Sequence, residues 1–432
     1  MKVPEILLIE TGHRPASLAR VLEVVDAAGL TIESLEAVGR DREKTVWELT
    51  LELDEQVDEA VLRRIDAIPE VEVVGRSDRV FNRHRGGKIE TVSRVPVSTV
   101  QELRDIYTPG VARVCLALRE DPALAREYTH RANTVAIVTN GTAVLGLGDL
   151  GALASLPVME GKAALFHQLV GISGVPILID ETDPDRVVEA IAAIAPSFGA
   201  IQLADIGAPR CFAIEEALSR RLDIPVLHDD QDGTAVVTLA ALLSATRRMG
   251  LDLENASVGQ IGLGAAGTGI TRLLLAYGVG DVLGVDLDPR AVARLESMGG
   301  RGVGLEGLMA NSDIVVAATG VKGLIRPEMV RPGQLVLALS KPEPEIEPEV
   351  ALAQGAAYAT DGKSVNNLLG FPGLFRGALD VGVREITEAM LFAAAETLAR
   401  LAPEGQLVPD PLDRAVHRAV AESVREAARD GA

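Results

Sequence analysis

One stretch of the chain has the order of segments that a dinucleotide-binding fold requires. The glycine-rich run GLGAAG at 262–267 follows a strand-like segment, ASVGQIG, and precedes a helical pattern, ITRLLLAYG. Asp286 ends the next strand-like segment, VLGVD, 19 positions after Gly267. Glycines at such a turn let the backbone approach a pyrophosphate at the helix N-terminus, and the acidic residue can bind ribose hydroxyls. The run therefore predicts a Rossmann-type domain with a parallel sheet.

Two later segments extend this prediction to more strands and to the choice of cofactor. SDIVVAATG at 312–320 and GQLVLALSKP at 333–342 are interpreted as parallel strands whose carboxyl ends face the same crevice. Asp286 favours NAD over NADP because a carboxylate repels a ribose phosphate, while the nearby Arg290 and Arg294 leave NADP open. The cofactor-binding residues predicted in this part of the chain are Gly262, Gly264, Ala265, Ala266, Gly267, Asp286 and Thr319.

A second run with the same glycine spacing, GLGDLG at 146–151, lacks this context. The residues after it read ALASLPVMEG, so Pro157 interrupts the place where the helix of a dinucleotide motif has to begin. No acidic residue follows at the required distance. We interpret this run as a loop beside a site and not as a second nucleotide fold.

Charge and cysteine content restrict the partners and the compartment. Lys and Arg total 42 and Asp and Glu total 62, so the formal net charge is −20. This acidity argues against a nucleic-acid surface or a polybasic membrane patch, and the apolar run at 235–245 is too short to span a bilayer. Cys115 and Cys211 are the only cysteines, which favours a reducing cytoplasm. We expect a cytoplasmic protein that acts on a small-molecule substrate, without nucleic-acid or membrane partners.

The first 80 residues have a pattern of their own. Strand-like and helical segments alternate in the order βαββαβ, which is the ferredoxin-like arrangement. This part resembles the ACT regulatory module, which implies an amino-acid effector at the loop after the first strand. In that module a glycine commonly follows the proline of the loop, whereas here Ala16 follows Pro15, so a purely structural or dimerising role stays open. The basic, glycine-containing segment at 81–95 is the predicted linker to the rest of the chain.

Four further segments appear in a recognisable order around the nucleotide run. They are YTPGVARVC at 107–115, LPVMEGKAALF at 156–166, IPVLHDDQDGTA at 224–235 and SVNNLLGFPGLFRGALD at 364–380. Together they resemble malic enzymes of the small bacterial type with an added N-terminal ACT-like domain, and the resemblance covers roughly residues 88–400. It implies oxidation of L-malate by hydride transfer to NAD(P), loss of CO2, and protonation of the resulting enolate to give pyruvate.

The resemblance also implies the groups that move protons. The lysine of that family matches Lys162, and we expect burial and a nearby metal to lower its pKa so that it accepts the hydroxyl proton of the substrate. The tyrosine that protonates the enolate matches Tyr107. In the small bacterial type this tyrosine comes from the neighbouring subunit, which implies a homodimer.

The metal and substrate residues implied by the family are only partly present. Mg²⁺ or Mn²⁺ would be held by Asp205 and Asp230, but Ala204 stands where the family has a glutamate ligand. Lys341 takes the place of a substrate-binding asparagine. Asp232 replaces the usual histidine of the DDQ segment. The amides expected at the substrate are Asn366 and Asn367, and Asn367 is also expected to reach the cofactor.

These departures leave two outcomes for the site and a third for the chain. Asp205, Asp230 and their acidic neighbours can complete a metal site for ordinary malic-enzyme chemistry. Alternatively, Lys341 supplies part of the positive charge, giving a dehydrogenase for another anionic 2-hydroxy acid with reduced or no metal dependence. A catalytically silent NAD-binding regulatory protein is the third reading, and retention of Lys162 and Tyr107 argues against it.

The whole chain is therefore predicted to be an α/β protein with several domains. An ACT-like domain covers residues 1–80 and the linker 81–95. The remaining boundaries are residues 96–227 for the catalytic domain, 228–395 for the Rossmann domain, and 396–432 for a C-terminal helical segment that packs back on the catalytic domain or its partner.

Overall fold

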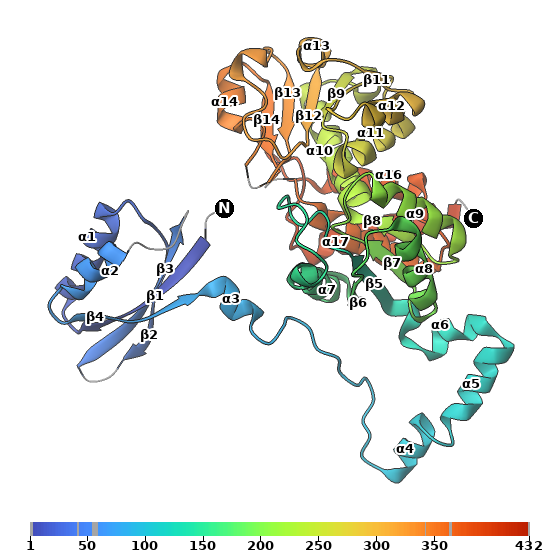
Figure 1. Ribbon diagram of the computed structural model, residues 1–432, viewed down its shortest axis with the longest axis horizontal. Helices are drawn as coiled ribbons and strands as arrows, with labels where there is room; N and C mark the ends of the chain where they lie inside the picture. The colour runs from blue at the N-terminus through green and yellow to red at the C-terminus, as the bar shows by residue number, and fades with distance from the viewer. Residues whose placement is uncertain (1–2, 41–42, 54–58, 342, 363–364, 431–432) are drawn as a thin grey trace. The chain divides into compact units, whose positions relative to one another are not determined.

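The computed structural model describes every residue except 1–2, 41–42, 54–58, 342, 363–364 and 431–432. The chain divides into two compact units, Met1–Glu90 and Thr91–Ala432. We call them unit 1 and unit 2 and describe each by itself (Figure 1).

Unit 1 has one antiparallel sheet with the strand order β2-β3-β1-β4. Two helices lie between its strands in the order βαββαβ, so the ferredoxin-like arrangement predicted from the sequence is confirmed. A short helix, α3 (Arg79–His84), follows the last strand, so the segment predicted as a linker over 81–95 begins in a helix. The other elements are β1 (Val3–Gly12), α1 (Pro15–Ala27), β2 (Thr31–Arg40), β3 (Lys44–Leu53), α2 (Glu59–Asp66) and β4 (Val71–Asp78).

The core of unit 1 follows from the alternation of apolar residues in its central strands. Leu49 and Leu51 on β3 point to the same face as Leu7 and Ile9 on β1, and all four are fully buried. Val21 of α1 packs in the same cluster, as do residues of α2. The helices therefore cover one face of the sheet.

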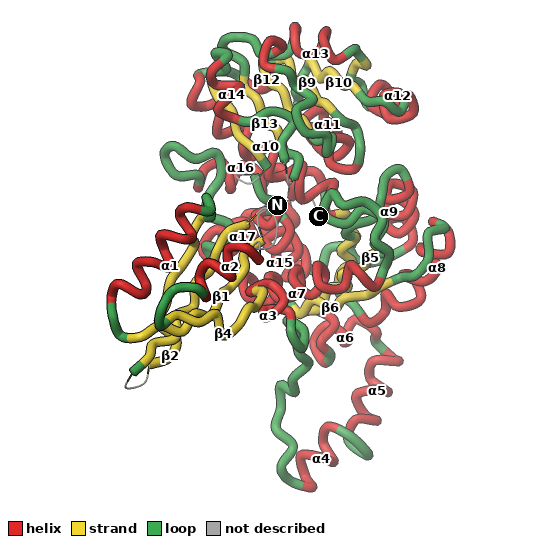
Figure 2. The backbone as a smooth tube through the Cα atoms, turned by 60° about the vertical axis from the view of Figure 1, so that its left-hand side comes forward, coloured by secondary structure: helices red, strands yellow, loops and turns green. Residues whose placement is uncertain are grey.

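Unit 2 contains a parallel four-stranded sheet with the order β6-β5-β7-β8, and helices pack on both of its faces (Figure 2). The strands are β5 (Thr134–Thr139), β6 (Ser173–Leu178), β7 (Ala200–Leu203) and β8 (Val226–His228). The helices in and before this part are α4 (Val100–Ile106), α5 (Val111–Glu120), η1 (Pro122–Leu124), α6 (Ala125–Tyr128), η2 (His130–Asn133), η3 (Leu153–Ser155), α7 (Leu156–Val170), α8 (Pro184–Ile194), η4 (Ala195–Ser197) and α9 (Arg210–Arg221).

The second sheet of unit 2 is parallel and six-stranded, in the order β11-β10-β9-β12-β13-β14. This is the doubly wound arrangement that the glycine run predicted. The strands are β9 (Ser257–Ile261), β10 (Asp281–Val285), β11 (Arg301–Gly302), β12 (Ile314–Ala317), β13 (Leu335–Ala338) and β14 (Tyr358–Asp361). The helices around it are η6 (Leu253–Asn255), α11 (Ala265–Tyr277), α12 (Pro289–Ser297), α13 (Leu305–Asn311), η7 (Pro327–Met329) and α14 (Pro348–Ala353).

The two sheets of unit 2 are joined by a π-helical turn, η5 (Asp229–Gly233), and by helix α10 (Thr234–Met249). Helix α10 is buried along most of its length and belongs to a hydrophobic cluster that reaches both sheets. Because its residues are buried on nearly all sides until the last turn, it is a core helix of the kind expected in a large domain. Among the described residues, no helix is both long and apolar enough to cross a membrane.

The C-terminal part of unit 2 returns to the first sheet. It consists of η8 (Asn367–Leu369), α15 (Phe371–Val381), α16 (Glu388–Leu401) and α17 (Arg414–Asp430). Val420 and Val424 of α17 lie over Gly373 and Gly377 of α15, where an added Cβ would come within 2.6 Å of a valine methyl group. Because α17 also packs on α7, the C-terminal helix does return to the catalytic part, as its periodicity suggested.

Candidate active site

The turn η5 carries three aspartates at the carboxyl end of strand β8. Asp229, Asp230 and Asp232 lie within this single π-helical turn, and Asp229 is fully buried. Glu215 on α9 holds the turn from one side, because its carboxylate accepts the backbone N–H of His228 at 2.8 Å and the side-chain amide of Gln231 at 2.8 Å. The aspartates are therefore fixed in place by the protein before any ligand binds.

Lys162 reaches this turn from helix α7. Pro157 sits in the first turn of α7, where the missing N–H costs nothing, so the proline begins the helix and does not prevent it. The ammonium of Lys162 donates a hydrogen bond to Asp229 Oδ2, and the two side chains are 12% and 0% exposed. The Lys162 ammonium also lies 5.6 Å from the centre of the Phe371 ring. The structure thus brings together a lysine and an aspartate that are 67 residues apart.

Ionisation in this cluster is strongly coupled. Burial disfavours the charged ammonium, but the charges of Asp229, Asp230 and Asp205 outweigh it and raise the pKa of Lys162. The sequence prediction of a lowered lysine pKa included a nearby metal, and burial alone does not produce that lowering here, because the three carboxylates oppose it. Burial, together with the charge of Asp230, raises the pKa of Asp205 to about 7.

Asp205 occupies a strained position beside the turn. Its φ is 54°, in the left-handed region that residues other than glycine seldom adopt. Its backbone N–H donates to Asp230 Oδ2 at 2.8 Å, and its own Oδ2 is buried without a partner among the described residues, as is Oδ1 of Asp229. Buried carboxylate oxygens that lack hydrogen bonds are costly unless a cation or water meets them.

These oxygens fit a hard divalent cation. Asp205 and Asp230 supply carboxylates side by side, which is the donor type that Mg²⁺ and Mn²⁺ prefer. Ala204 is fully buried and adds no donor. Mg²⁺ usually keeps several waters and is often bound through only one or two protein carboxylates. Among the described residues, no group of three or more His, Cys, Asp or Glu side chains is arranged to hold a metal ion.

The two asparagines predicted at the substrate have different surroundings. Asn367 Nδ2 donates to Asp229 Oδ2 at 3.3 Å, which places it in the carboxylate cluster. The side-chain oxygen of Asn366 instead accepts the N–H of Leu368 and caps the short helix η8. Asn366 is thus a capping residue in this conformation, and only Asn367 contacts the cluster.

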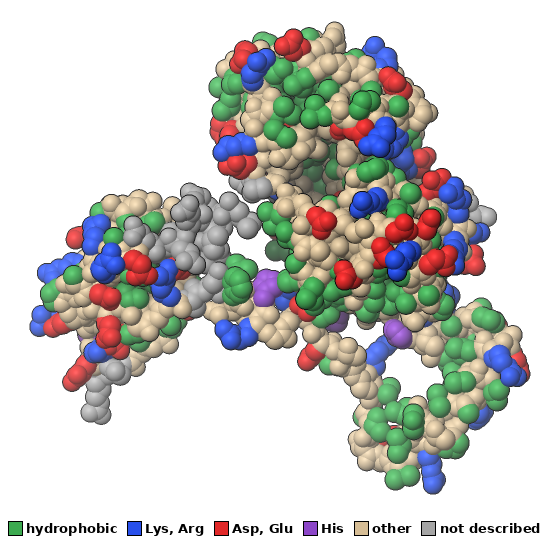
Figure 3. Space-filling model, viewed as in Figure 1, with side chains coloured by type: hydrophobic (Ala, Val, Ile, Leu, Met, Phe, Trp, Pro, Cys, Tyr) green, Lys and Arg blue, Asp and Glu red, His purple; other side chains and the backbone are tan. Residues whose placement is uncertain are grey.

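Lys341 follows strand β13 at the edge of the second sheet, and its side chain is exposed. Its carbonyl oxygen lies so close to Gly146 that an added Cβ there would approach it to 2.9 Å. Although the residue keeps access to solvent, partial burial lowers the pKa of the Lys341 ammonium. The first glycine run is therefore a loop that packs against a predicted site residue, in agreement with the interpretation of 146–151 as a loop. Figure 3 shows the surface hollowed between the two sheets of unit 2.

Tyr107 is not part of this cluster within the single chain. It ends helix α4 and is 66% exposed. Helices α4 and α5, residues 100–120, form what we call the arm, which extends away from α7 in both views (Figures 1 and 2). Neither helix has a buried residue, and apolar side chains gather on the arm (Figure 3).

The second glycine run forms the turn that the sequence predicted. Gly262 has a φ of 86°, and a Cβ on Gly267 would lie 1.8 Å from the carbonyl oxygen of Gly262, so only glycine permits this packing. Helix α11 begins directly after Gly264, with its free N–H groups at the carboxyl edge of the sheet. Asp286 is oriented by two backbone N–H groups, those of Leu263 at 2.6 Å and Asp288 at 2.8 Å.

The two arginines that left NADP open are both engaged elsewhere. Arg290 pairs with Asp288 at 3.1 Å, and the guanidinium of Arg294 lies 4.4 Å from the centre of the Phe212 ring. Neither contact involves Asp286. This arrangement agrees with the preference for NAD that the carboxylate of Asp286 predicted.

Glu345 is a residue that the sequence reasoning missed. Its carboxylate is fully buried and accepts the N–H of Thr319 at 2.7 Å, the Thr319 hydroxyl at 2.8 Å, and the Ser340 hydroxyl. It thereby fixes the loops after β12 and β13, including the predicted cofactor residue Thr319. No local signal marked it, because its partners lie 26 and 5 residues away.

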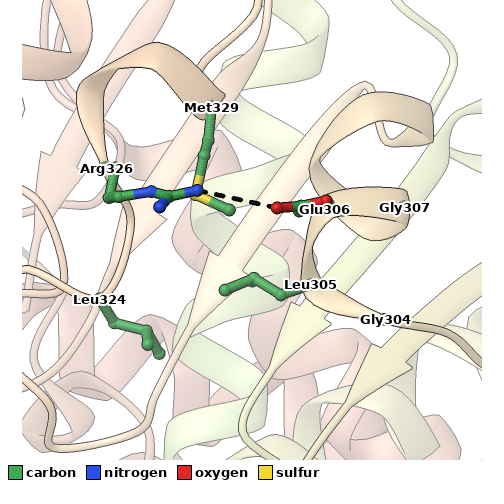
Figure 4. A pocket seen from close by; sticks show the side chains of 7 residues that line it. All are labelled: Gly304, Leu305, Glu306, Gly307, Leu324, Arg326 and Met329. Atoms are coloured by element: carbon green, nitrogen blue, oxygen red, sulfur yellow. Dashed lines mark ion pairs between the residues drawn. The ribbon is translucent and has the colours of Figure 1, made fainter.

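A cavity of about 670 Å³ opens beside the second sheet, next to residues that follow β11 (Figure 4). Leu305, Leu324 and Met329 give it an apolar side, and an ion pair of 3.8 Å between Arg326 and Glu306 borders it. None of its lining residues belongs to the carboxylate cluster, so it is separate from the site around Lys162.

Comparison with known proteins agrees with both halves of unit 2. Residues 86–219 match the family model of the malic enzyme N-terminal domain. Residues 231–323 match the NAD-binding domain of D-isomer specific 2-hydroxyacid dehydrogenases. The second match coincides with the glycine turn and Asp286, which supports the assignment of a nucleotide fold to this region.

Relatives cover nearly the whole chain. NAD-dependent malic enzyme 1 of Bacillus subtilis is 52% identical over 98% of this chain and 97% of its own length. NAD-dependent malic enzyme of Geobacillus stearothermophilus is 41% identical over 95% of this chain and 91% of its own.

Solved structures agree as well. The malic enzyme of Pyrococcus horikoshii has a TM-score of 0.76 at 38% identity and covers 80% of this chain and 88% of its own. The NAD-dependent malic enzyme of Thermotoga maritima has the same TM-score and identity and covers 81% of this chain and 99% of its own. The malic-enzyme part of the resemblance is thereby confirmed, and the chain belongs to the NAD-dependent malic enzyme family of bacteria.

Proposed function

We propose that this chain catalyses the oxidative decarboxylation of L-malate to pyruvate and CO2 with reduction of NAD. The observation that carries the proposal is the buried pair of Lys162 and Asp229, next to Asp205 and Asp230. This reaction requires three parts, and unit 2 contains a candidate for each of them: a base, a set of cation ligands and a dinucleotide-binding turn.

Each proton has a defined route in this proposal. Lys162 accepts the proton of the C2 hydroxyl while the hydride leaves C2, and Asp229 stabilises the resulting ammonium through its hydrogen bond. Loss of CO2 then leaves an enolate, and Tyr107 donates the proton that C3 gains. Asn367 is proposed to orient a substrate carboxylate, with Lys341 as a second contact at the edge of the site.

Cofactor and cation have proposed positions on these residues. When bound, NAD accepts the hydride, and Mg²⁺ or Mn²⁺ polarises the substrate oxygen and stabilises the enolate charge. Asp205 and Asp230 would hold the cation. The turn at 262–267 would hold the pyrophosphate, Asp286 the adenosine ribose, and Thr319 the nicotinamide side.

A raised lysine pKa does not conflict with this role. The pKa of Lys162 is raised because three carboxylates surround one ammonium. A divalent cation bound among those carboxylates would offset their negative charge and so lower this pKa. Asp205, with its pKa of about 7, is the group whose charge such a cation changes most easily. The proton acceptor is therefore prepared by cation binding at the same cluster.

We further propose that the working form is a homodimer in which the arm carries Tyr107 to the partner's Lys162. Several apolar residues of the arm are exposed, among them Val100 at 66% and Leu116 at 51%. Burying apolar surface is favourable by about 25 cal/mol per Å². Association of the arm with a second chain would therefore be stabilised by the hydrophobic effect. Within unit 2, the domains are proposed at residues 96–227, 228–395 and 396–432.

Unit 1 is proposed to be an ACT-like regulatory domain that binds an amino acid. A cavity of about 530 Å³ opens where β1 meets the loop before α1. Both cationic and anionic side chains line it, including Arg14, Lys44 and Glu70, and this suits a zwitterion. Isothermal titration of the full chain with single amino acids tests this role, and heat from none of them would leave unit 1 with a structural or dimerising role.

The function itself is tested by turnover. Purified protein is assayed for reduced cofactor and pyruvate with L-malate, with NAD or NADP, and with Mn²⁺ or a chelator. We expect pyruvate formation that depends on Mn²⁺ and is faster with NAD. NAD binding without turnover of malate would overturn the proposal.

Ala204 and Lys341 favour one alternative, a dehydrogenase for another anionic 2-hydroxy acid with less dependence on metal. The missing glutamate and the added ammonium both make the site more positive. A double variant, Ala204→Glu with Lys341→Asn, separates the two functions. Gain of metal dependence on malate in the variant alone would favour the alternative, whereas metal dependence in both proteins supports the malic-enzyme reaction.

A further inference from the structure

Helix α11 and the turn η5 meet at a largely buried ion pair. Arg272 Nη2 donates to Asp232 Oδ1 at 2.5 Å, and the two side chains are 33% and 9% exposed. Arg272 lies two turns into the helix whose N-terminus faces the cofactor, and Asp232 lies two residues after Asp230. The pair therefore links the cofactor helix to the turn that carries the cation ligand.

The backbones approach closely at the same contact. An added Cβ on Gly269 would lie 2.4 Å from the carbonyl oxygen of Gln231, so only glycine allows α11 to lie this near to η5. On its other side the turn is held by Glu215, through His228 and Gln231. The turn η5 is thus clamped between α9 and α11, with the ion pair on the α11 side.

The partner of Asp232 comes from the helix of the nucleotide turn, 40 residues later in the chain. Arg272 also reaches Glu388 of α16 at 3.5 Å. The guanidinium therefore lies between two carboxylates from different parts of unit 2 and meets each of them through a different nitrogen atom.

The consequence concerns the distance between two reactants. Malate is expected at Lys162, Asp205 and Asp230, whereas the nicotinamide is positioned by α11 and its sheet. Hydride transfer requires reacting atoms at about 3–3.5 Å, and a shift of about 1 Å can cost a factor of about 100 in rate. A contact that sets the register of α11 against η5 therefore sets this distance.

We propose that Arg272 and Asp232 are positioning residues that hold the cofactor helix in register with the catalytic turn. This inference rests on the proposed function. Neither residue is expected to touch the substrate or NAD. Loss of the pair should slow hydride transfer and leave the affinity for NAD nearly unchanged.

The test compares Arg272→Met with Arg272→Lys, which keeps a cation opposite Asp232. Titration calorimetry gives the Kd for NAD, and turnover of malate and of malate deuterated at C2 gives kcat/KM and its isotope effect. For Arg272→Met we expect a Kd within twofold of the wild type, kcat/KM lower by about 10- to 100-fold, and a larger isotope effect. Arg272→Lys should recover at least half of the loss on a logarithmic scale.

Arg301→Met is the matched control. Arg301 pairs with Asp281 at 2.5 Å within the same sheet, at the edge opposite the carboxyl ends of the strands. It should leave both kcat/KM and the isotope effect unchanged. If Arg272→Met behaves like this control, or weakens NAD binding as much as it slows turnover, the proposal is wrong.

Asp232→Asn provides a second, milder route to the same result. It keeps the side-chain size and an oxygen for Arg272 but removes the charge, and it carries the test if Arg272→Met does not fold. In the double variant the losses should not add, because both changes remove one contact. Additive losses would overturn the pairing. Turnover of malate by the wild type is measured first, so a failure of the proposed function is recognised separately.

Discussion

Lys162 and Tyr107 are the two proton-transfer residues expected of this family, and the structure treats them in opposite ways. Lys162 is 12% exposed and hydrogen-bonded to a fully buried aspartate. Tyr107 is 66% exposed on an arm with no buried residue in either helix. In the proposed homodimer, the half of the site around Lys162 is organised by the chain's own core, and Tyr107 completes the site of the partner subunit. The comparison separates what a subunit can do alone from what requires assembly.

The largest expected effects come from removing each residue in turn. Lys162→Ala and Tyr107→Phe should each lower kcat by about 100- to 10,000-fold, because general acid–base groups contribute on this scale. Thermal unfolding distinguishes the two halves. Lys162→Ala leaves the buried carboxylate of Asp229 without its ion-pair partner and should lower Tm, whereas Tyr107→Phe should not. Equal stability changes in both variants would contradict the contrast.

Mixing the two inactive variants tests whether the halves come from different chains. Random re-association of Lys162→Ala with Tyr107→Phe gives about half heterodimers, each with one intact site, and so about a quarter of the wild-type activity. Mixing Lys162→Ala with the wild type, at matched total subunits, controls for dilution. Activity that stays at the level of the single variants would mean that each site is built within one chain.

A smaller effect is expected from the arm surface alone. Leu116→Glu places a charge where the arm is proposed to meet a partner, so activity should fall by about tenfold at low protein concentration and recover at high concentration. Leu412→Glu changes a residue that is 66% exposed in unit 2 but outside the arm. The control should show no dependence on concentration, as measured by sedimentation and turnover together. Identical behaviour of the two variants would remove the arm from the interface.

The smallest expected effect is a pH dependence of thermal stability that arises in the cluster around Lys162. The folded pKa of Asp205 is about 7, above the usual unfolded value of about 4, so its contribution to stability is present at low pH and lost as pH rises through 7. Without divalent cations, Tm should fall by about 2 °C between pH 6 and pH 8 for this reason.

Asp205→Asn should lack this component of the pH dependence, and Mn²⁺ at pH 8 should restore the stability of the wild type. Differential scanning calorimetry in the presence of a chelator measures the first effect, and addition of Mn²⁺ measures the second. A pH dependence that is unchanged in Asp205→Asn would show that another group titrates.

Features of the fold and of the candidate site could be predicted from the sequence where the interacting residues lie close together along the chain. The turn at Gly262–Gly267 and the orientation of Asp286 involve neighbouring segments, so spacing alone predicted them. The raised pKa of Lys162 was not predictable, because three aspartates, from the loop after β7 and from η5, converge on it from distant positions. The residue type suggested that Lys162 is a base, but only the fold determines which charges surround it and thus its pKa.

The arm illustrates a second limit of sequence reasoning. The segment VARVCLALRE of α5 has the apolar content of an ordinary packed helix, yet none of its residues is buried in the single chain. Hydrophobic patterning shows that a face will be covered but does not show by which chain. Glu345 and Arg272 were missed for the related reason that their partners are 26 and 40 residues away.

The left-handed backbone conformation of Asp205 has a consequence for engineering the thermal stability of this protein. A non-glycine residue at a φ of 54° is strained by an amount on the order of 1 kcal/mol, and its carboxylate is crowded by two others. Asn or Gly at this position would relieve both burdens, so a search guided by melting temperature alone would select it early. The same exchange removes a proposed cation ligand. Natural selection for turnover should therefore keep aspartate at position 205, whereas laboratory selection for heat resistance should replace it.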